Sequence, residues 1–255
     1  MRKINYSKVR RSAQADLKRY ERLGVKIFTK ALKEQAKPVV PLLPMQNAYV
    51  EFYQTVFVDS ATKEFNRIRQ DNREKEFILD GFFLELWKEF IKNWVLQNLG
   101  QLIFDVTDTS QKKVNEIVAQ GIKDGLNPRQ IEDLLIKEIP DVKRARAIAR
   151  TESTRAYNEG KKKSAMDWAN QTGTQLWKIW IHGGAKEPRI QHIQAQNVPK
   201  RFDQPFVFFN NGVQVLMDKP GDLNGGAAQT VNCSCVVIYV SESYARRYFK
   251  DSFII

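Results

Sequence analysis

The chain has 255 residues, of which 41 are lysine or arginine and 29 are aspartate or glutamate, so its formal net charge is +12. Hydrophobic residues make up 42% and charged residues 27% of the sequence, which excludes an acidic disordered chain and is typical of a folded globular protein. The basic surplus favours a negatively charged partner: nucleic acid, an anionic membrane surface or an acidic protein.

Two classes of protein are excluded by simple patterns. The N-terminus is basic but lacks the apolar stretch of a secretory signal. The most apolar stretch, residues 77–96, is interrupted by five charged side chains, so we expect no membrane-spanning helix and no membrane partner. The two cysteines, Cys233 and Cys235, cannot make a disulfide framework and fit a reducing compartment.

The first 37 residues are predicted to form a basic helical arm. They carry a net charge of +9, and apolar residues recur at near-helical spacing from Val9 to Leu32. The basic face of this helix is either simply solvated or a contact surface for a polyanion. Residues 38–105 are predicted to form a linker with Pro38, Pro41 and Pro44, followed by a helical region. Its aromatic stretch, residues 76–99, is typical of a core helix or helix pair.

The remaining chain predicts three further helices and a small β unit. Capping and proline signals place helices at residues 109–125, 128–139 and 143–170. Between residues 174 and 241, short apolar runs alternate with Gly, Asn and Pro, and Asn210-Asn211-Gly212 predicts a hairpin turn. Residues 242–255 resemble a short helix or tail. The predicted class is α+β, with helices in the N-terminal two-thirds followed by a small loop-rich β unit.

One face of the helix at 143–170 carries a polar stripe. The stripe combines carboxylate, guanidinium, hydroxyl and amide groups beside a row of alanines that permits close packing, and it comprises Thr151, Glu152, Arg155, Asn158 and Glu159. We favour a hydrogen-bond network that joins the helix to the β unit, with a catalytic site as the alternative.

Both histidines and both cysteines of the chain lie in the predicted β unit. Two imidazoles and two thiolates would suit a tetrahedral zinc site formed by His182, His192, Cys233 and Cys235. The Cys-x-Cys spacing is not that of a zinc knuckle, and buried structural cysteines are the alternative interpretation. No required cofactor is expected. Nucleotide-binding, metalloprotease and serine-hydrolase motifs are missing from the sequence, so we do not expect an enzyme.

Residues 109–237 carry an ordered set of motifs. Residues 144–152 read R-A-x-x-I-A-R-T-E, and an Arg and an Asn follow at 155 and 158. Further along the chain are two tryptophans, an R-x-x-H, a Pro-Gly-Asp and an N-C-x-C motif, formed by Trp177, Trp180, Arg189, His192, Pro220, Gly221, Asp222, Asn232, Cys233 and Cys235. This order resembles the phage Mu F-like minor head proteins, also called the SPP1-type head morphogenesis family. His182 matches no position of that pattern, which weakens the four-ligand zinc site.

The resemblance implies a structural minor capsid protein of a tailed bacteriophage, with its family domain at residues 106–241. Such a protein would reside in the virion at the portal vertex after assembly in host cytoplasm, and would act in head morphogenesis and in DNA packaging or ejection. The implied partners are the portal protein, double-stranded DNA bound without sequence preference, and capsid or scaffold proteins. The motif residues named above, with Arg150, Thr151 and Glu152, would be structural.

The N-terminal cations are the candidate contacts to DNA or portal, namely Arg2, Lys3, Lys8, Arg10, Arg11, Lys18, Arg19 and Arg22. Two alternative functions remain. One is a nuclease-like or toxin-like enzyme built on Glu152, Arg155, His192 and Asp222, which requires Glu152 and His192 to face one open cleft. The other is a DNA-binding module stapled by zinc.

Overall fold

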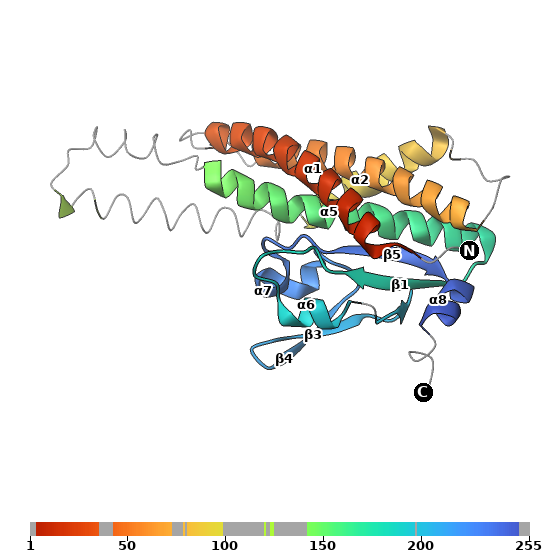
Figure 1. Cartoon of the computed structure of the whole chain (residues 1–255). Helices are drawn as coiled ribbons and strands as arrows, with labels where there is room; N and C mark the ends of the chain where they lie inside the picture. Colours follow the sequence, from red (N-terminus) through yellow and green to blue (C-terminus); the bar gives the residue numbers. More distant parts are fainter. Residues whose placement is uncertain are drawn as a thin grey trace.

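The computed structural model describes residues 4–35, 43–72, 79, 81–98, 120, 123–124, 142–196 and 198–249. Long helices form one layer, and a small unit of antiparallel strands lies against it, which confirms the α+β class (Figure 1). Two further helices were predicted at residues 109–125 and 128–139. Apart from residues 120, 123 and 124, these ranges lie outside the described residues. Within the described ranges, no helix combines the length and apolar character that crossing a membrane requires.

The basic N-terminal segment is a long helix packed into the core. This helix, α1, runs over Tyr6–Gln35 and buries Ala13, Leu17 and Tyr20 on one side. A Cβ atom at Gly24 would lie 2.8 Å from Cβ of Ala149, so the glycine permits close approach of the two helices. The segment expected as an arm is therefore an integrated part of the helical layer.

Two more long helices, α2 and α5, belong to the helical layer. Helix α2 spans Leu43–Asp71, and α5 spans Val142–Thr172, close to the helix predicted at 143–170. Both pack against α1 and against each other (Figure 1). Because α2 begins at Leu43, Pro44 falls in its first turn, where a proline costs no helical hydrogen bond.

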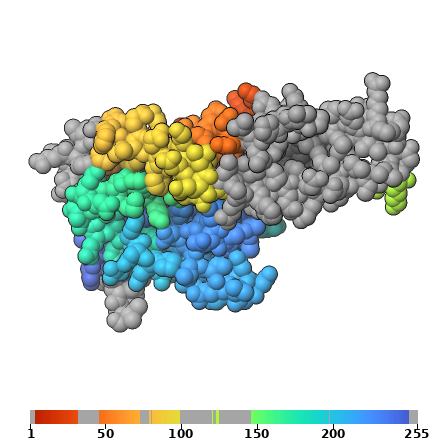
Figure 2. All heavy atoms as spheres, turned by 180° about the vertical axis from the view of Figure 1, so that it is seen from behind, coloured from red at the N-terminus to blue at the C-terminus, as the bar shows by residue number. Residues whose placement is uncertain are grey.

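The aromatic stretch that predicted a core helix is helical at residues 81–98. Trp87 of this helix is fully buried against Phe65, and its indole N–H donates to Asp167 of α5 at 2.7 Å. In contrast, Phe82 is 68% exposed, so the aromatic stripe is only partly core. Figure 2 shows this helix, in yellow, beside the orange α2, with the blue β unit below them.

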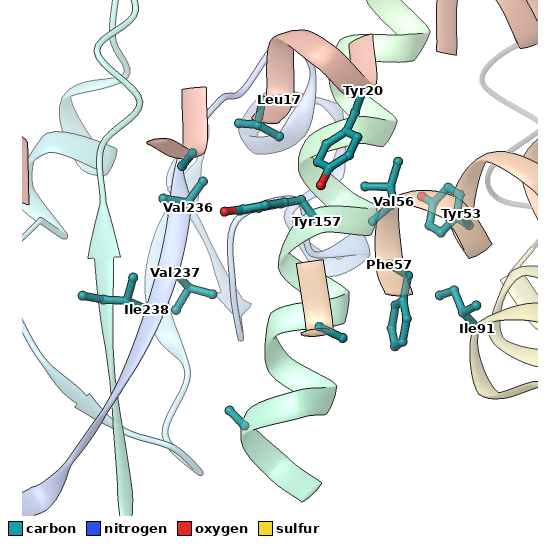
Figure 3. Packing of buried hydrophobic residues seen from close by; sticks show 14 of the residues in the cluster. Leu17, Tyr20, Tyr53, Val56, Phe57, Ile91, Tyr157, Val236, Val237 and Ile238 are labelled. Carbon is teal, nitrogen blue, oxygen red and sulfur yellow. The ribbon is translucent and has the colours of Figure 1, made fainter. Parts of the chain in front are cut away.

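The central sheet has three antiparallel strands in the order β2-β1-β5. β1 spans Leu176–Ile181, β2 spans Lys200–Arg201 and β5 spans Val236–Ser241. Leu176 pairs with Ser241 and Ile181 with Val236. Every residue of β5 is buried, as expected for a continuous apolar run covered on both faces. Figure 3 shows Val236 of β5 beside Tyr157 of α5, and Tyr20 of α1 next to Tyr157.

A two-stranded hairpin lies below the central sheet (Figure 1). β3 spans Phe206–Asn210 and β4 spans Val213–Met217. Asn211 and Gly212 connect them with φ of 49° and 83°, the left-handed pair that a tight hairpin turn requires. The hairpin predicted from Asn210-Asn211-Gly212 is thus confirmed. Its inner face forms a second small core with Trp180, apart from the main core.

Short helical segments fill the loops of the β unit. They are α6 over Ile190–Gln194, the 3-10 turn η1 over Leu223–Gly225, α7 over Gly226–Thr230 and α8 over Glu242–Tyr248. Helix α8 confirms the helical alternative for the start of residues 242–255. The oxygen of the Ser241 side chain accepts from the Tyr244 amide and caps α8.

Candidate functional site

The polar stripe of α5 faces the loop that leads into β5. Thr154 Oγ1 donates to the carbonyl of Cys233 at 2.6 Å, and Asn158 Nδ2 donates to the carbonyl of Cys235 at 3.2 Å. The amide of Val237 in turn donates to Asn158 Oδ1 at 2.9 Å. Asn158 is completely buried, so its side chain provides the hydrogen-bond partners that water would provide to exposed backbone groups. These hydrogen bonds join α5 to the β unit.

Thr151 extends the same network by one turn. Its Oγ1 accepts from the amide of Asn232 at 3.2 Å. Asn232 adopts φ of 54°, a left-handed conformation that asparagine tolerates better than most residues. The Asn-Cys-x-Cys motif is therefore a turn whose backbone groups are bound by side chains of α5.

Glu152 and Arg155 form a buried ion pair in the middle of α5. Arg155 Nη1 lies 2.7 Å from each oxygen of the Glu152 carboxylate, and Arg155 Nε donates to the carbonyl of Gly221 at 3.1 Å. The hydroxyl of Tyr53 on α2 donates to the same carboxylate. Burial and the charge of Glu152 raise the pKa of Tyr53, so the phenol stays a donor. Although burial opposes it, Glu152 raises the pKa of Arg155.

The Pro-Gly-Asp loop is shaped to receive Arg155. Gly221 has φ of 79°, and a Cβ atom there would lie 2.8 Å from Cα of Arg155. The adjacent Pro220 is buried. Asp222 Oδ2 accepts from the amide of Asp218 at 2.8 Å, and Oδ1 accepts from the amide of Asn224 at 3.0 Å, which caps η1. Each member of the loop thus has a structural role.

Two side chains of the R-x-x-H motif, from α6 and its N-terminal cap, contact α7 and the residue that follows it. Arg189 donates from Nε to the carbonyl of Ala228 at 2.6 Å and from Nη2 to that of Val231 at 2.8 Å. These carbonyls lie at the C-terminal end of α7, where the helix leaves acceptors unpaired. His192 Nε2 lies 2.9 Å from Oε1 of Gln229. The motif therefore fixes α7 to α6.

His192 also meets both cysteines. Its Nδ1 lies 3.6 Å from Sγ of Cys233 and 3.5 Å from Sγ of Cys235, and all three side chains are at most 3% exposed. Cys235 and His192 lower the pKa of the Cys233 thiol, whereas Cys233 and burial raise that of Cys235. His182 lies outside this group, and its Nδ1 accepts from the amide of Gly184 at 3.1 Å. Among the described residues, the structure gathers three of the four predicted zinc ligands.

The structure does not join the residues of the enzyme hypothesis into one cleft. Glu152 binds Tyr53 and Arg155, whereas His192 binds Gln229 and the cysteines, and both are at most 5% exposed. Asp222 is occupied with the backbone of its own loop. Within the described ranges, Glu152 and His192 therefore have different partners and are both buried, and Arg155 reaches the loop of Asp222 only through the carbonyl of Gly221.

Exposed cations run along the outer face of α1. They recur every three to seven residues on one side of the helix: Lys8, Arg11, Lys18, Arg22, Lys26 and Lys30. This basic stripe is about 33 Å long at 1.5 Å per residue. In the described part of the chain, none of the six takes part in an ion pair. Lys26 and Lys30 were not among the predicted contacts, although they continue the helical spacing of the cations past Arg22.

Other predicted contacts have internal partners or lie outside the described residues. Arg19 pairs with Asp59 of α2, and Arg10 Nη2 donates to Oε1 of Gln196 at 2.8 Å. Arg150 pairs with Glu21 of α1 at 3.2 Å, which links α5 to α1. Arg2 and Lys3 lie outside the described residues. Tyr53 and Gln229 were also missed, because no local pattern marks a residue whose partner is remote in sequence.

Comparison with known proteins gives one match. Residues 112–238 match the family model described as Phage Mu protein F like protein. The matched range contains every residue of the ordered motifs from Arg144 to Cys235. Neither the curated proteins nor the solved structures yield a match.

Proposed function

The chain belongs to the phage Mu protein F like family of phage head morphogenesis proteins, and we propose that it is a minor head protein of the portal vertex that contacts DNA through α1. Its proposed partners are the portal protein, double-stranded DNA and, during assembly, capsid or scaffold proteins. Its proposed roles are DNA packaging and ejection. The virion location follows from the family, and the portal vertex is part of the proposal.

The basic stripe of α1 is the observation that carries the DNA contact. Six exposed cations lie on one helix face, and the opposite face is anchored in the core by Ala13, Leu17 and Tyr20. A rigid row of cations can neutralise several phosphates at once and release their counterions. Contacts from lysine and arginine to phosphates carry no sequence information, so binding through them would be independent of sequence.

A salt series with duplex DNA tests this contact. If six phosphates are neutralised, the logarithm of the association constant falls with the logarithm of salt concentration at a slope of about −5. The triple variant Lys18→Gln, Arg22→Gln and Lys26→Gln should lower the magnitude of that slope by about three. Its matched control is Lys123→Gln, Lys186→Gln and Arg247→Gln, which removes the same charge from exposed sites elsewhere. Equal slopes for the two variants would place the DNA contact away from α1.

The portal location needs a measurement on particles. Mass spectrometry of purified virions should detect the chain in few copies, and a reconstruction without imposed icosahedral symmetry should place its density at the portal vertex. Absence of the chain from purified particles contradicts the proposal. Normal DNA content and normal ejection in particles that lack the chain would contradict the packaging and ejection roles.

A further inference from the structure

We propose that His192, Cys233 and Cys235 bind one zinc ion, with His192 Nδ1 and the two thiolates as its protein ligands. This site goes beyond the proposed head function and does not depend on it. The three side chains come from α6 and from the turn before β5, which are remote in sequence. Their ligand atoms all lie within 4.8 Å of one another.

The distances match those of a tetrahedral zinc site. With Zn–S of about 2.3 Å and Zn–N of about 2.0–2.1 Å, two ligand atoms at the tetrahedral angle are separated by about 3.6 Å for an S–N pair. The observed separations are 3.6 Å for Cys233 and 3.5 Å for Cys235. Both S–N separations therefore fit a single ion shared by three atoms that all lie within 4.8 Å of one another.

Without a metal ion, the arrangement needs a hydrogen-bond relay in which one thiol bonds the other and one thiol bonds Nδ1. A neutral imidazole nitrogen that carries no proton has one lone pair, so it can accept from one thiol but not from two. Both sulfur atoms lie equally close to the same Nδ1. A cation at the centre satisfies the lone pair and both thiolates together.

The surroundings hold His192 in the tautomer that a metal ligand needs. Gln229 Nε2 donates to Oδ1 of Asn210 at 2.8 Å and to the carbonyl of Phe209 at 3.2 Å, which turns its Oε1 toward His192. Asn210 is oriented in turn, since its Nδ2 donates to the carbonyl of Gly225 at 3.1 Å. Gln229 Oε1 therefore accepts the proton of Nε2 and leaves the lone pair of Nδ1 directed at the sulfurs.

The ligand set favours zinc, and its place in a small core suits an ion that holds neighbouring segments together. Two thiolates and an imidazole favour zinc over magnesium or calcium, which prefer oxygen ligands. The ring of Trp180 lies 4.9 Å from that of His192, and the ring of Phe208 lies 5.2 Å from it. Trp180 and Phe208 belong to the small second core, beside which a bound ion would join α6 to the turn before β5. Three protein ligands leave a fourth position for an exogenous donor.

Metal content and cobalt spectroscopy test the site on the full chain. Protein purified without chelator should contain one zinc per chain. After chelation under reducing conditions, titration with Co²⁺ should give thiolate-to-metal charge-transfer absorption that Zn²⁺ abolishes. Cys233→Ser, Cys235→Ser and His192→Ala should each lose this absorption. Gln229→Ala should keep it with an affinity lowered about 10- to 100-fold.

His182→Ala is the matched control, because it removes the other histidine of the chain. It should bind one zinc with unchanged affinity. Circular dichroism of each variant shows whether the fold persists, and the Gln229→Ala affinity tests the site without removing a ligand. The absence of stoichiometric zinc and of cobalt absorption in the folded protein overturns the proposal. Loss of zinc in His182→Ala, or a Cys233–Cys235 disulfide in protein freshly prepared under reducing conditions, does so as well.

Discussion

Tyr53 on α2 donates a hydrogen bond to the carboxylate of Glu152 on α5, and both side chains are buried. Tyr53 precedes the range that matches the family model, whereas Glu152 lies within its most ordered motif. A second buried contact of this kind joins Glu64 of α2 to Lys161 of α5 at 3.2 Å. The N-terminal helices therefore complete the polar networks of the family domain.

Removing the hydroxyl of Tyr53 should destabilise the fold. Tyr53→Phe leaves one bond of a buried carboxylate unmade, which typically costs about 1–3 kcal/mol. Tyr239→Phe is the control, since the hydroxyl of Tyr239 is buried with no partner among the described residues. Urea unfolding should show a loss for Tyr53→Phe and little change or a gain for Tyr239→Phe. A loss of the same size in both variants would show that ring packing, not the hydrogen bond, dominates.

The buried carboxylate of Glu64 should make stability depend on pH in the acid range. Burial raises its pKa, but Arg67 and Lys161 outweigh burial and hold the pKa at about 2, below the ordinary 4.5. A lowered pKa contributes stability that is complete above pH 4.5 and is lost as the pH falls toward 2. The shift corresponds to about 3 kcal/mol.

Urea unfolding of Glu64→Gln across this range checks the prediction. The variant should be destabilised by about 3–5 kcal/mol at pH 7, because Lys161 stays buried without its counter-charge. Between pH 4.5 and 2 it should lose less stability than the unsubstituted chain. Glu51→Gln, an exposed position on the same helix, should follow the unsubstituted chain. Parallel curves for Glu64→Gln and the unsubstituted chain would assign the acid sensitivity to other carboxylates.

Gly221 should tolerate no side chain. Gly221→Ala adds a Cβ atom 2.8 Å from backbone of Arg155 at a position with φ of 79°. Gly212→Ala has nearly the same strain, with φ of 83°, but no atom within 4 Å of the added carbon. Left-handed strain costs about 1–2 kcal/mol in either case, and overpacking adds about 1–3 kcal/mol at Gly221 alone. The midpoint of thermal unfolding should be lower for Gly221→Ala than for Gly212→Ala. The reverse order would contradict the close packing of Gly221 against the backbone of Arg155.

Asn158 should protect the start of β5 from local opening. Asn158→Ala leaves the amide of Val237 and the carbonyl of Cys235 without their side-chain partner, at about 1–3 kcal/mol for each unsatisfied group. The exchange rate of the Val237 amide should increase. The exchange rate of the Ile179 amide, on the neighbouring strand, should increase only as much as the loss of global unfolding free energy predicts. Unchanged protection at Val237 would mean that water replaces the asparagine.

Local patterns predicted much of the β unit. The run Leu176–Ile181 is a strand at the predicted bounds, and the hairpin turn at Asn211-Gly212 follows from two residues that accept positive φ. The two-residue strand at Lys200–Arg201 and helix α7 were not predicted. Segments this short carry no periodicity, and tertiary contacts such as those of Arg189 hold them in place.

Long-range relationships were the part that sequence patterns could not supply. The charge of residues 1–37 predicted a contact surface but not that Tyr20 and Leu17 would bury the other face of α1. The clustering of His and Cys in the sequence predicted that His192 lies beside both cysteines. It could not show that His182, at the end of β1, binds its own loop instead.

The contacts between α2 and α5 in this chain have a consequence for recombination within its gene. A crossover at the start of the matched range would join residues 112–238 to a foreign N-terminal half. The product would bury Glu152 and Lys161 against helices that evolved without Tyr53 and Glu64. Phage genomes that shuffle this gene should therefore exchange it whole, or carry the two α2 residues along with the motif they serve.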